Sequence, residues 1–419
     1  MAITLHLPTL QNWSCHNCGG CCRQHAIYIT EDERKRIESQ NWTAADGVAG
    51  PLFVKEGGWL RPGRQRLAHQ ADGGCVFLDE RGLCRIHAKF GEPAKPLACR
   101  IYPYAFHPSG KSVVVSLRYS CPSVVDNKGK TLRQQTGDLQ ELARLVVPKG
   151  GDQLPPPAVS ATAKLDWPDF HRLVRGLDAT LADDEEPLVA RLVQALEWVN
   201  LIGQASFEKV RGARVDELVE ILRTAVAEQM PDLETVAEPT ALGRLQFRLL
   251  AAQYARKDTE IDLRSGWRGR WRLFRTALSF SRGKGQIPVL QPGFRSVPFE
   301  ALEKSFGPLP AEAEETLTRY FRVKVQGLHF CGPAYYGVPF AEGFASLALV
   351  YPVVLWIARW LAASEERTTL EASDVSRALA IADHHHGYAD IFGSAGFRSR
   401  VKLLASKGEI GKLAVWYSR

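Results

Sequence analysis

From residue 167 onward, apolar residues recur at every third or fourth position of the chain. This spacing places them on one face of an α-helix, because an α-helix has 3.6 residues per turn. It predicts helices over 167–179, 186–202, 214–229, 239–255, 311–325, 344–363 and 370–382. We therefore expect the larger part of the chain to be a predominantly α-helical domain.

The first third of the chain lacks this periodicity, and its short segments are interrupted by glycines. Two elements can still be predicted there. Thr30 and Glu33 fit a capping box at the start of a helix over 30–39. The β-branched run Ser112–Leu117 is typical of a strand. We expect a small, irregular α+β module here.

A segment rich in proline and glycine, 147–157, separates the two patterns and is the best candidate linker. A second such break covers 284–297. The predicted organisation is a cysteine-rich, metal-binding module over 1–146, a linker over 147–157 and a mainly α-helical domain over 158–419.

Composition agrees with a globular protein of two domains. The chain has 419 residues, of which 45% are apolar and 24% charged, and its net charge is a modest +7. Residues 1–13 show no basic segment followed by an apolar stretch, so no secretory signal is predicted and we expect a cytoplasmic protein. In that reducing compartment, clustered cysteines typically bind metals or act in redox chemistry.

The apolar run 344–357 is long enough to raise the question of a membrane span. It covers 14 residues, bounded by Glu342 and Arg359, whereas a spanning helix needs about 20. Pro352 in its middle also favours a kink. We expect a buried core helix and no membrane span.

Eight of the nine cysteines lie between residues 15 and 121. They are Cys15, Cys18, Cys21, Cys22, Cys75, Cys84, Cys99 and Cys121. The first four form a C-x2-C-x2-C-C run, and Gly19 and Gly20 within it permit the backbone angles that wrapping around a metal requires. The same spacing occurs in bacterial ferredoxins, whose thiolates hold [4Fe–4S] clusters.

The number of thiols leaves several arrangements open. Eight thiolates suit two four-ligand sites, or one iron–sulfur cluster and one zinc ion. A metal-free redox dithiol system is a further alternative. Nearby histidines could replace individual thiolates, although each is more typical of a surface histidine or of one with its hydrogen bonds satisfied: His16, His25, His69, His87 and His107. The ninth cysteine, Cys331, is predicted to pack as a small hydrophobe.

A second candidate for metal chemistry is the run His384, His385 and His386. Consecutive residues of a helix point in different directions, so at most two of these imidazoles could meet one ion. A solvent-exposed helix end is the favoured interpretation.

Four segments resemble one known family. They are CHNCGGCCR (15–23), CVFLD (75–79), GLCRIH (82–87) and KPLACRIYPY (95–104). Their order resembles that of the CxxCxxCC family of zinc- or iron-chelating domains, often called YkgJ-like, which includes flagellin lysine N-methylases. The resemblance implies that the eight clustered cysteines are metal ligands, and it marks Arg100 and Pro103 as motif positions. The sequence departs from the family at His87, commonly tyrosine, and at Lys95, which replaces the arginine of an Arg-Pro pair.

The resemblance also implies an activity, the transfer of a methyl group from S-adenosylmethionine to a protein lysine. The sequence carries neither a G-x-G-x-x-G turn after a predicted strand nor the C-x3-C-x2-C spacing of radical S-adenosylmethionine enzymes. Catalytic and cofactor-binding residues are therefore not identified. Tyr102, Tyr104 and Tyr119 could orient a substrate amine, although packing is the commoner role for tyrosines.

Two other functions remain open. One is a zinc-stabilised scaffold whose helical part binds a protein partner, and the other is an iron–sulfur protein for electron transfer or redox sensing. The zinc-stabilised scaffold implies a protein partner, and the methylase interpretation implies a protein substrate. Nucleic-acid binding is not expected, because aromatic residues do not interleave with a strong basic patch. The oligomeric state cannot be inferred.

Overall fold

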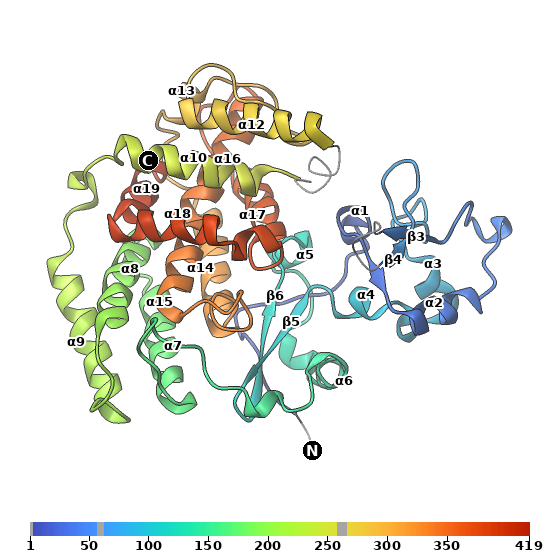
Figure 1. Ribbon diagram of the computed structural model, residues 1–419, viewed down its shortest axis with the longest axis horizontal. Coiled ribbons are helices and arrows are strands. Elements are labelled where there is room, and N and C mark those ends of the chain that lie inside the picture. The colour runs from blue at the N-terminus through green and yellow to red at the C-terminus, as the bar shows by residue number, and fades with distance from the viewer. Residues whose placement is uncertain (1–2, 57–62, 258–265) are drawn as a thin grey trace.

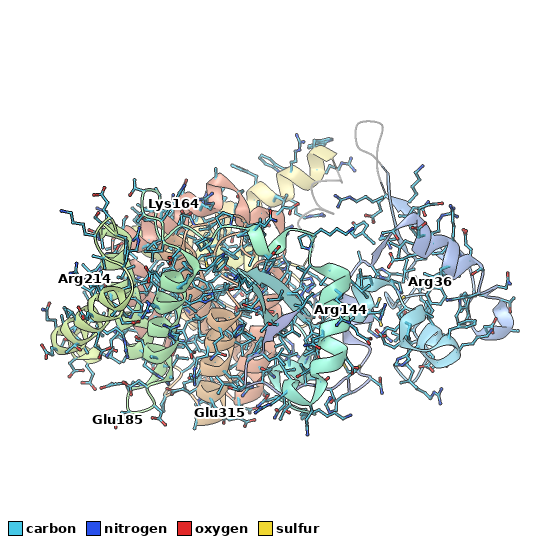
Figure 2. The ribbon with its side chains drawn as sticks, turned by 90° about the horizontal axis from the view of Figure 1, so that it is seen from below. Arg36, Arg144, Lys164, Glu185, Arg214 and Glu315 are labelled. Carbon is cyan, nitrogen blue, oxygen red and sulfur yellow. The ribbon has the colours of Figure 1, made fainter. Side chains whose placement is uncertain are left out.

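A computed structural model describes residues 3–56, 63–257 and 266–419. Figure 1 shows a small lobe, drawn in blue, beside a much larger helical body. Figure 2 gives the same division from below, with Arg36 in the small lobe and Arg214 at the far end of the body. This confirms the predicted fold class, a small α+β part followed by a larger helical part.

The small lobe consists of short elements. They are α1 (Gly20–Gln24), β2 (Tyr28–Ile29), α2 (Glu31–Glu38), β3 (Phe53–Glu56), β4 (Arg64–Leu67), α3 (Arg85–Phe90) and α4 (Leu97–Ile101). The strands form an antiparallel sheet in the order β2-β4-β3. The capping box of Thr30 and Glu33 is present, which confirms the predicted helix start. A small hydrophobic core of its own, including Ile37, Phe77 and Ile86, lies inside this lobe.

A second sheet connects the small lobe to the body. It contains β1 (Thr4–His6), β6 (Ser112–Leu117) and β5 (Tyr104–Ser109) in the order β1-β6-β5, and β6 has the predicted bounds. It is followed by α5 (Pro122–Val125) and α6 (Thr136–Val146). Apolar residues of this part, such as Val115 and Leu142, belong to the same core as the body helices. The core is therefore continuous across the predicted linker 147–157, where the chain is mostly without regular structure.

The remaining helices make up the body. They are α7 (Trp167–Ala182), α8 (Leu188–Gln204), α9 (Ala213–Gln229), α10 (Ala241–Ala255), α12 (Gly266–Arg282), α13 (Phe299–Leu302), α14 (Ala311–Gln326), α15 (Phe340–Ala348), α16 (Val350–Ser364), α17 (Ala372–His385), α18 (Ala395–Ser406) and α19 (Glu409–Tyr417). Every helix predicted after residue 167 is found, and the predicted helix over 344–363 corresponds to α15 and α16 together. Four of the helices described in the body were not predicted: α12, α13, α18 and α19.

The apolar segment Phe340–Ser364 is at the centre of the body. Within the described part of the chain it is the one helical stretch long and apolar enough to cross a bilayer, judged by length and composition. Of its most apolar window, 89% is buried inside the protein, which is typical of a core helix. Pro352 is accommodated in the first turn of α16, where its missing N–H has no helical partner to lose.

One buried ion pair ties the body to the second sheet. Lys324 on α14 and Asp383 on α17 are both fully buried, and Lys324 Nζ lies 2.7 Å from Asp383 Oδ1. Lys324 also donates to the carbonyl oxygen of Leu117, at 3.0 Å, while Asp383 Oδ2 accepts from the backbone N–H groups of Tyr119 (2.5 Å) and Ser120 (3.3 Å). Burial raises the pKa of Asp383 and lowers that of Lys324, and their mutual attraction opposes both changes.

Removal of the Asp383 carboxylate should be costly, because it leaves a buried ammonium and two buried N–H groups without their acceptor. We expect Asp383→Ala to lower the free energy of unfolding by about 3–5 kcal/mol, measured by urea denaturation. Asp126→Ala, which removes the partner of the exposed Lys128, is the matched control and should leave the midpoint unchanged. A loss of under about 1 kcal/mol in Asp383→Ala would show that the buried pair contributes little.

Candidate metal centre

The C-x2-C-x2-C-C run forms a loop that ends in the first turn of α1. Gly19 immediately precedes this helix with φ 65°, a left-handed conformation that favours glycine, whereas Gly20 is the first residue of α1 and has no such angle. Gly82 lies against the loop so closely that a Cβ atom there would meet the carbonyl oxygen of Asn17 at 2.6 Å. The loop of Cys15 and Cys18 and the turn before Cys84 are therefore packed directly on each other.

The other four cysteines approach this loop from separate elements. Cys75 follows β4, and its backbone N–H donates to the carbonyl oxygen of Cys22 at 2.9 Å. Cys84 and Cys121 directly precede α3 and α5, whereas Cys99 lies within α4. Residues up to 106 positions apart in the chain are thus brought to one place by short helices and turns.

All eight clustered cysteines line one cavity of about 1170 Å³, which we call the thiol cavity. Its remaining walls come from both the small lobe and the body. All eight are free thiols that range from buried (Cys75 and Cys121) to exposed (Cys15 and Cys18). Cys331 does not line the cavity and is 1% exposed among apolar residues of the body core, as predicted for a small hydrophobe.

Electrostatic effects divide the thiols into two neighbourhoods. Burial raises the pKa of Cys75 to about 11, and nearby Cys84 and Cys21 contribute to the increase. Burial also raises the pKa of Cys99, again with contributions from Cys75, Cys84 and Cys21. These four thiols therefore lie close enough to influence one another.

The second neighbourhood includes Cys121 and Cys18. The pKa of Cys121 is raised, first by burial, and Cys18 is the thiol that adds to this increase. Cys22 adjoins the first neighbourhood, because its Sγ is 3.9 Å from Cys21 Sγ, and their hydrogen bond is the main cause that raises the pKa of Cys21.

The donor set fits a thiolate-bound metal centre. Thiolate sulfur is the ligand that zinc and iron–sulfur clusters share, and eight thiols are enough for two four-ligand sites. Within the described residues, however, no three His, Cys, Asp or Glu side chains are gathered tightly enough to hold one ion. The thiols surround the cavity at wider spacing, so ligation of one ion would require several side chains to move inward.

Part of the cavity lining is polar. We call Tyr102, His107, Arg118 and Tyr388, which line the cavity, the polar wall. The guanidinium carbon of Arg118 lies 3.6 Å from the centre of the Tyr388 ring, a cation–π contact. Arg118 also donates to the carbonyl oxygen of His384 at 3.4 Å, and no carboxylate among the described residues pairs with it. The cavity therefore carries a positive charge beside its thiols.

Two histidines of the cavity are held neutral. Burial lowers the pKa of His25 to about 3, and Arg118 adds to the decrease. Burial likewise lowers the pKa of His107 to about 4, with a contribution from Lys324. Both Nε2 atoms are buried without a hydrogen-bond partner in the described part of the chain. A neutral imidazole of this kind can ligate a metal or accept a proton.

Of the other predicted candidates, His16, His87, Tyr102 and Tyr104 also line the cavity, whereas His69 and Tyr119 do not. Tyr119 is buried behind the cavity, where its hydroxyl donates to Gln11 Oε1 at 2.7 Å. Arg100 Nε and Glu92 Oε1 pair at 2.9 Å within the cavity wall, and Pro103 follows a cis peptide bond.

The prediction of a solvent-exposed helix end at His384–His386 is wrong. His386 is 1% exposed, and its Nδ1 lies 2.9 Å from the buried hydroxyl of Tyr254. His384 stacks on His25 of the small lobe at 4.9 Å between ring centres. The run is covered because α17 ends at the junction of lobe and body, so these rings fill that junction.

Some residues of the cavity carried no signal in the sequence. Arg118 and Tyr388 are 270 positions apart, and no local spacing connects them. Lys95, noted from the sequence as a departure from the family motif, has a chemical effect in the cavity, since its charge lowers the pKa of Cys99 against the larger effect of burial.

The cysteine-rich part of the chain matches a known family model. Neither a search of curated proteins nor a search of solved structures finds a match. Residues 14–122 match the model of the CxxCxxCC family, described as "Putative zinc- or iron-chelating domain". The matched segment begins one residue before Cys15 and ends one residue after Cys121, so it contains all eight clustered cysteines. The segment 14–122 is therefore similar to the zinc- or iron-chelating domain of the CxxCxxCC family.

Proposed function

We propose that residues 14–122 bind an iron–sulfur centre whose ligands are among the eight clustered cysteines. We also propose that a substrate reaches this centre through the thiol cavity. The observation that supports it is the set of eight thiols around one cavity of about 1170 Å³. A structural zinc site is a closed, four-coordinate site that leaves no such space. Ligand pockets are usually about 300–1,000 Å³, so this cavity has room for a metal cluster and a small molecule together.

The eight thiols are enough for two four-ligand centres, or for one centre that uses some of them. Cys21, Cys75, Cys84 and Cys99 form a four-thiol set of the size that one cluster needs. Cys18 and Cys121 belong to the second neighbourhood. An iron–sulfur cluster spaces its cysteine ligands more widely than a single ion does, which suits the open arrangement of these thiols.

Metal and acid-labile sulfide analysis of protein purified without oxygen tests this proposal. We expect iron with matching sulfide and a broad visible absorption. Cys99→Ser should reduce the metal content by about half or more, because a four-thiolate site loses one ligand. Cys331→Ala is the matched control, since Cys331 lies outside the cavity, and it should retain the wild-type content. Zinc without sulfide would contradict the proposal.

Metal binding should also depend on pH. Because burial holds the pKa of Cys75 near 11, its thiol is protonated in the metal-free protein at neutral pH and must lose a proton to ligate. Affinity should therefore rise with pH between 7 and 9, by about tenfold per unit for each proton released. Competition with a chelator of known affinity measures this slope, and a pH-independent affinity would show that thiols are not the ligands.

We further propose methyl transfer from S-adenosylmethionine to a protein lysine, as the family resemblance suggests. In this reaction a bond forms between the lysine nitrogen and the methyl carbon, the methyl–sulfur bond breaks, and a proton leaves the nitrogen. Burial and the charges of Arg118 and Lys324 make His25 and His107 resist protonation, so the proton passes from the nitrogen to solvent water. Arg118 is suited to bind an anionic group of a substrate, since it has no carboxylate partner among the described residues.

This activity predicts that methyl incorporation into protein lysine disappears in Cys21→Ala, because Cys21 belongs to the four-thiol set. The activity is measured as transfer of an isotopically labelled methyl group from S-adenosylmethionine to protein lysine. The control variant Cys331→Ala should remain active. Full activity in Cys21→Ala would show that the metal centre takes no part in catalysis.

A structural role is the second candidate. Cys75 belongs to the core of the small lobe, and Cys22 and Cys84 pack against it. A zinc ion bound at these positions would stabilise a lobe whose own core is small, and the helical body would then bind a protein partner. The metal analysis above distinguishes this function from the first.

A further inference from the structure

Helix α12 presents aromatic side chains to solvent. Gly269 and Phe280 are its buried residues, and it packs against α10. Its large apolar side chains face away from the protein: Trp267 is 74% exposed, Trp271 56%, Phe274 57% and Leu278 37%. The rings of Trp271 and Phe274 stack on each other, with centres 5.6 Å apart. We call these four residues the aromatic stripe.

The aromatic stripe is aligned along the helix. Its members are spaced by four, three and four residues, so at 100° per residue they fall within about 60° of arc. On the same projection, Gly269 and Phe280 lie on the opposite side, about 180° away. The stripe therefore points directly outward. Figure 1 shows α12 along the outer edge of the body, at the top of the view.

The charge of α12 has one sign. The helix contains five arginines and no acidic residue. Arg268, Arg270 and Arg275 are exposed and have no carboxylate partner in the described part of the chain, whereas Arg272 has an interaction partner. Arg268 and Arg275 flank the stripe on one side and Arg270 on the other, by the same helical projection.

We propose that α12 is a membrane-surface anchor, which lies in the interface of an anionic lipid bilayer with its aromatic stripe in the boundary between headgroups and acyl chains. A basic helix with Trp, Phe and Leu on one face is the type of segment that binds in this way. Tryptophan is favoured at the interface, and arginines can reach lipid phosphates while their aliphatic parts remain among the chains.

The dimensions of the stripe favour a lipid surface over a protein. The aromatic stripe runs from Trp267 to Leu278, about 17 Å along the helix axis, so at about 10 Å wide it offers roughly 170 Å². A stable protein interface buries about 800 Å² on each partner. A bilayer requires only this one apolar face, and its anionic phosphates complement the unpaired arginines.

Sedimentation with vesicles tests the proposal on the full chain. We expect binding to vesicles of phosphatidylcholine mixed with phosphatidylglycerol, and much weaker binding to phosphatidylcholine alone. Replacement of Trp267, Trp271 and Phe274 by serine should reduce the affinity for the mixed vesicles by about tenfold or more. Arg268→Gln and Arg275→Gln should each reduce it by about fivefold.

A matched control is available on other helices. Leu145 on α6, Leu201 on α8 and Ile221 on α9 are 52%, 42% and 64% exposed, and their joint replacement by serine should leave vesicle binding unchanged. The proposal is overturned if the wild type binds neither type of vesicle, or if the aromatic triple variant binds as well as the wild type. It is also overturned if the stripe instead supports a dimer in size-exclusion chromatography and no vesicle binding.

Discussion

The carboxylate of Asp383 is the constraint on which the junction of the protein depends. It lies on α17, pairs with Lys324 of α14 and accepts N–H groups from Tyr119 and Ser120. These two residues directly precede Cys121, so the position of that thiol follows from a charge in the interior of the body. Because both charges are fully buried, neither has water as an alternative partner, and the segment is held in one place.

Local rules were sufficient for much of the fold. The capping box at Thr30 and the strand Ser112–Leu117 each depend on residues that are neighbours in the chain, and both are present as predicted. The helices after residue 167 follow from apolar periodicity. Helix α12 has the same spacing, but its periodic residues are the exposed ones, so the usual link between apolar and buried positions is reversed.

The candidate site was predictable only in part. Spacing alone indicated that Cys15, Cys18, Cys21 and Cys22 belong together, because a short loop must bring them close. The polar wall could not be inferred, since Arg118 and Tyr388 meet only where α17 packs against α5, the helix that follows the second sheet. The histidine run was misjudged for a related reason: the burial of His386 is decided by what covers the end of its helix, and no local pattern encodes that.

The thiols of the cavity are anchored in two different hydrophobic cores. Cys75 belongs to the core of the small lobe, whereas Cys121 belongs to the core of the body. A metal centre with ligands from both cores would cross-link the small lobe and the body. This cross-link would not need a covalent bond between a side chain of the lobe and a side chain of the body. The mutual orientation of the units would then be set by coordination geometry, so the supply of metal would control the shape of the protein as well as its chemistry.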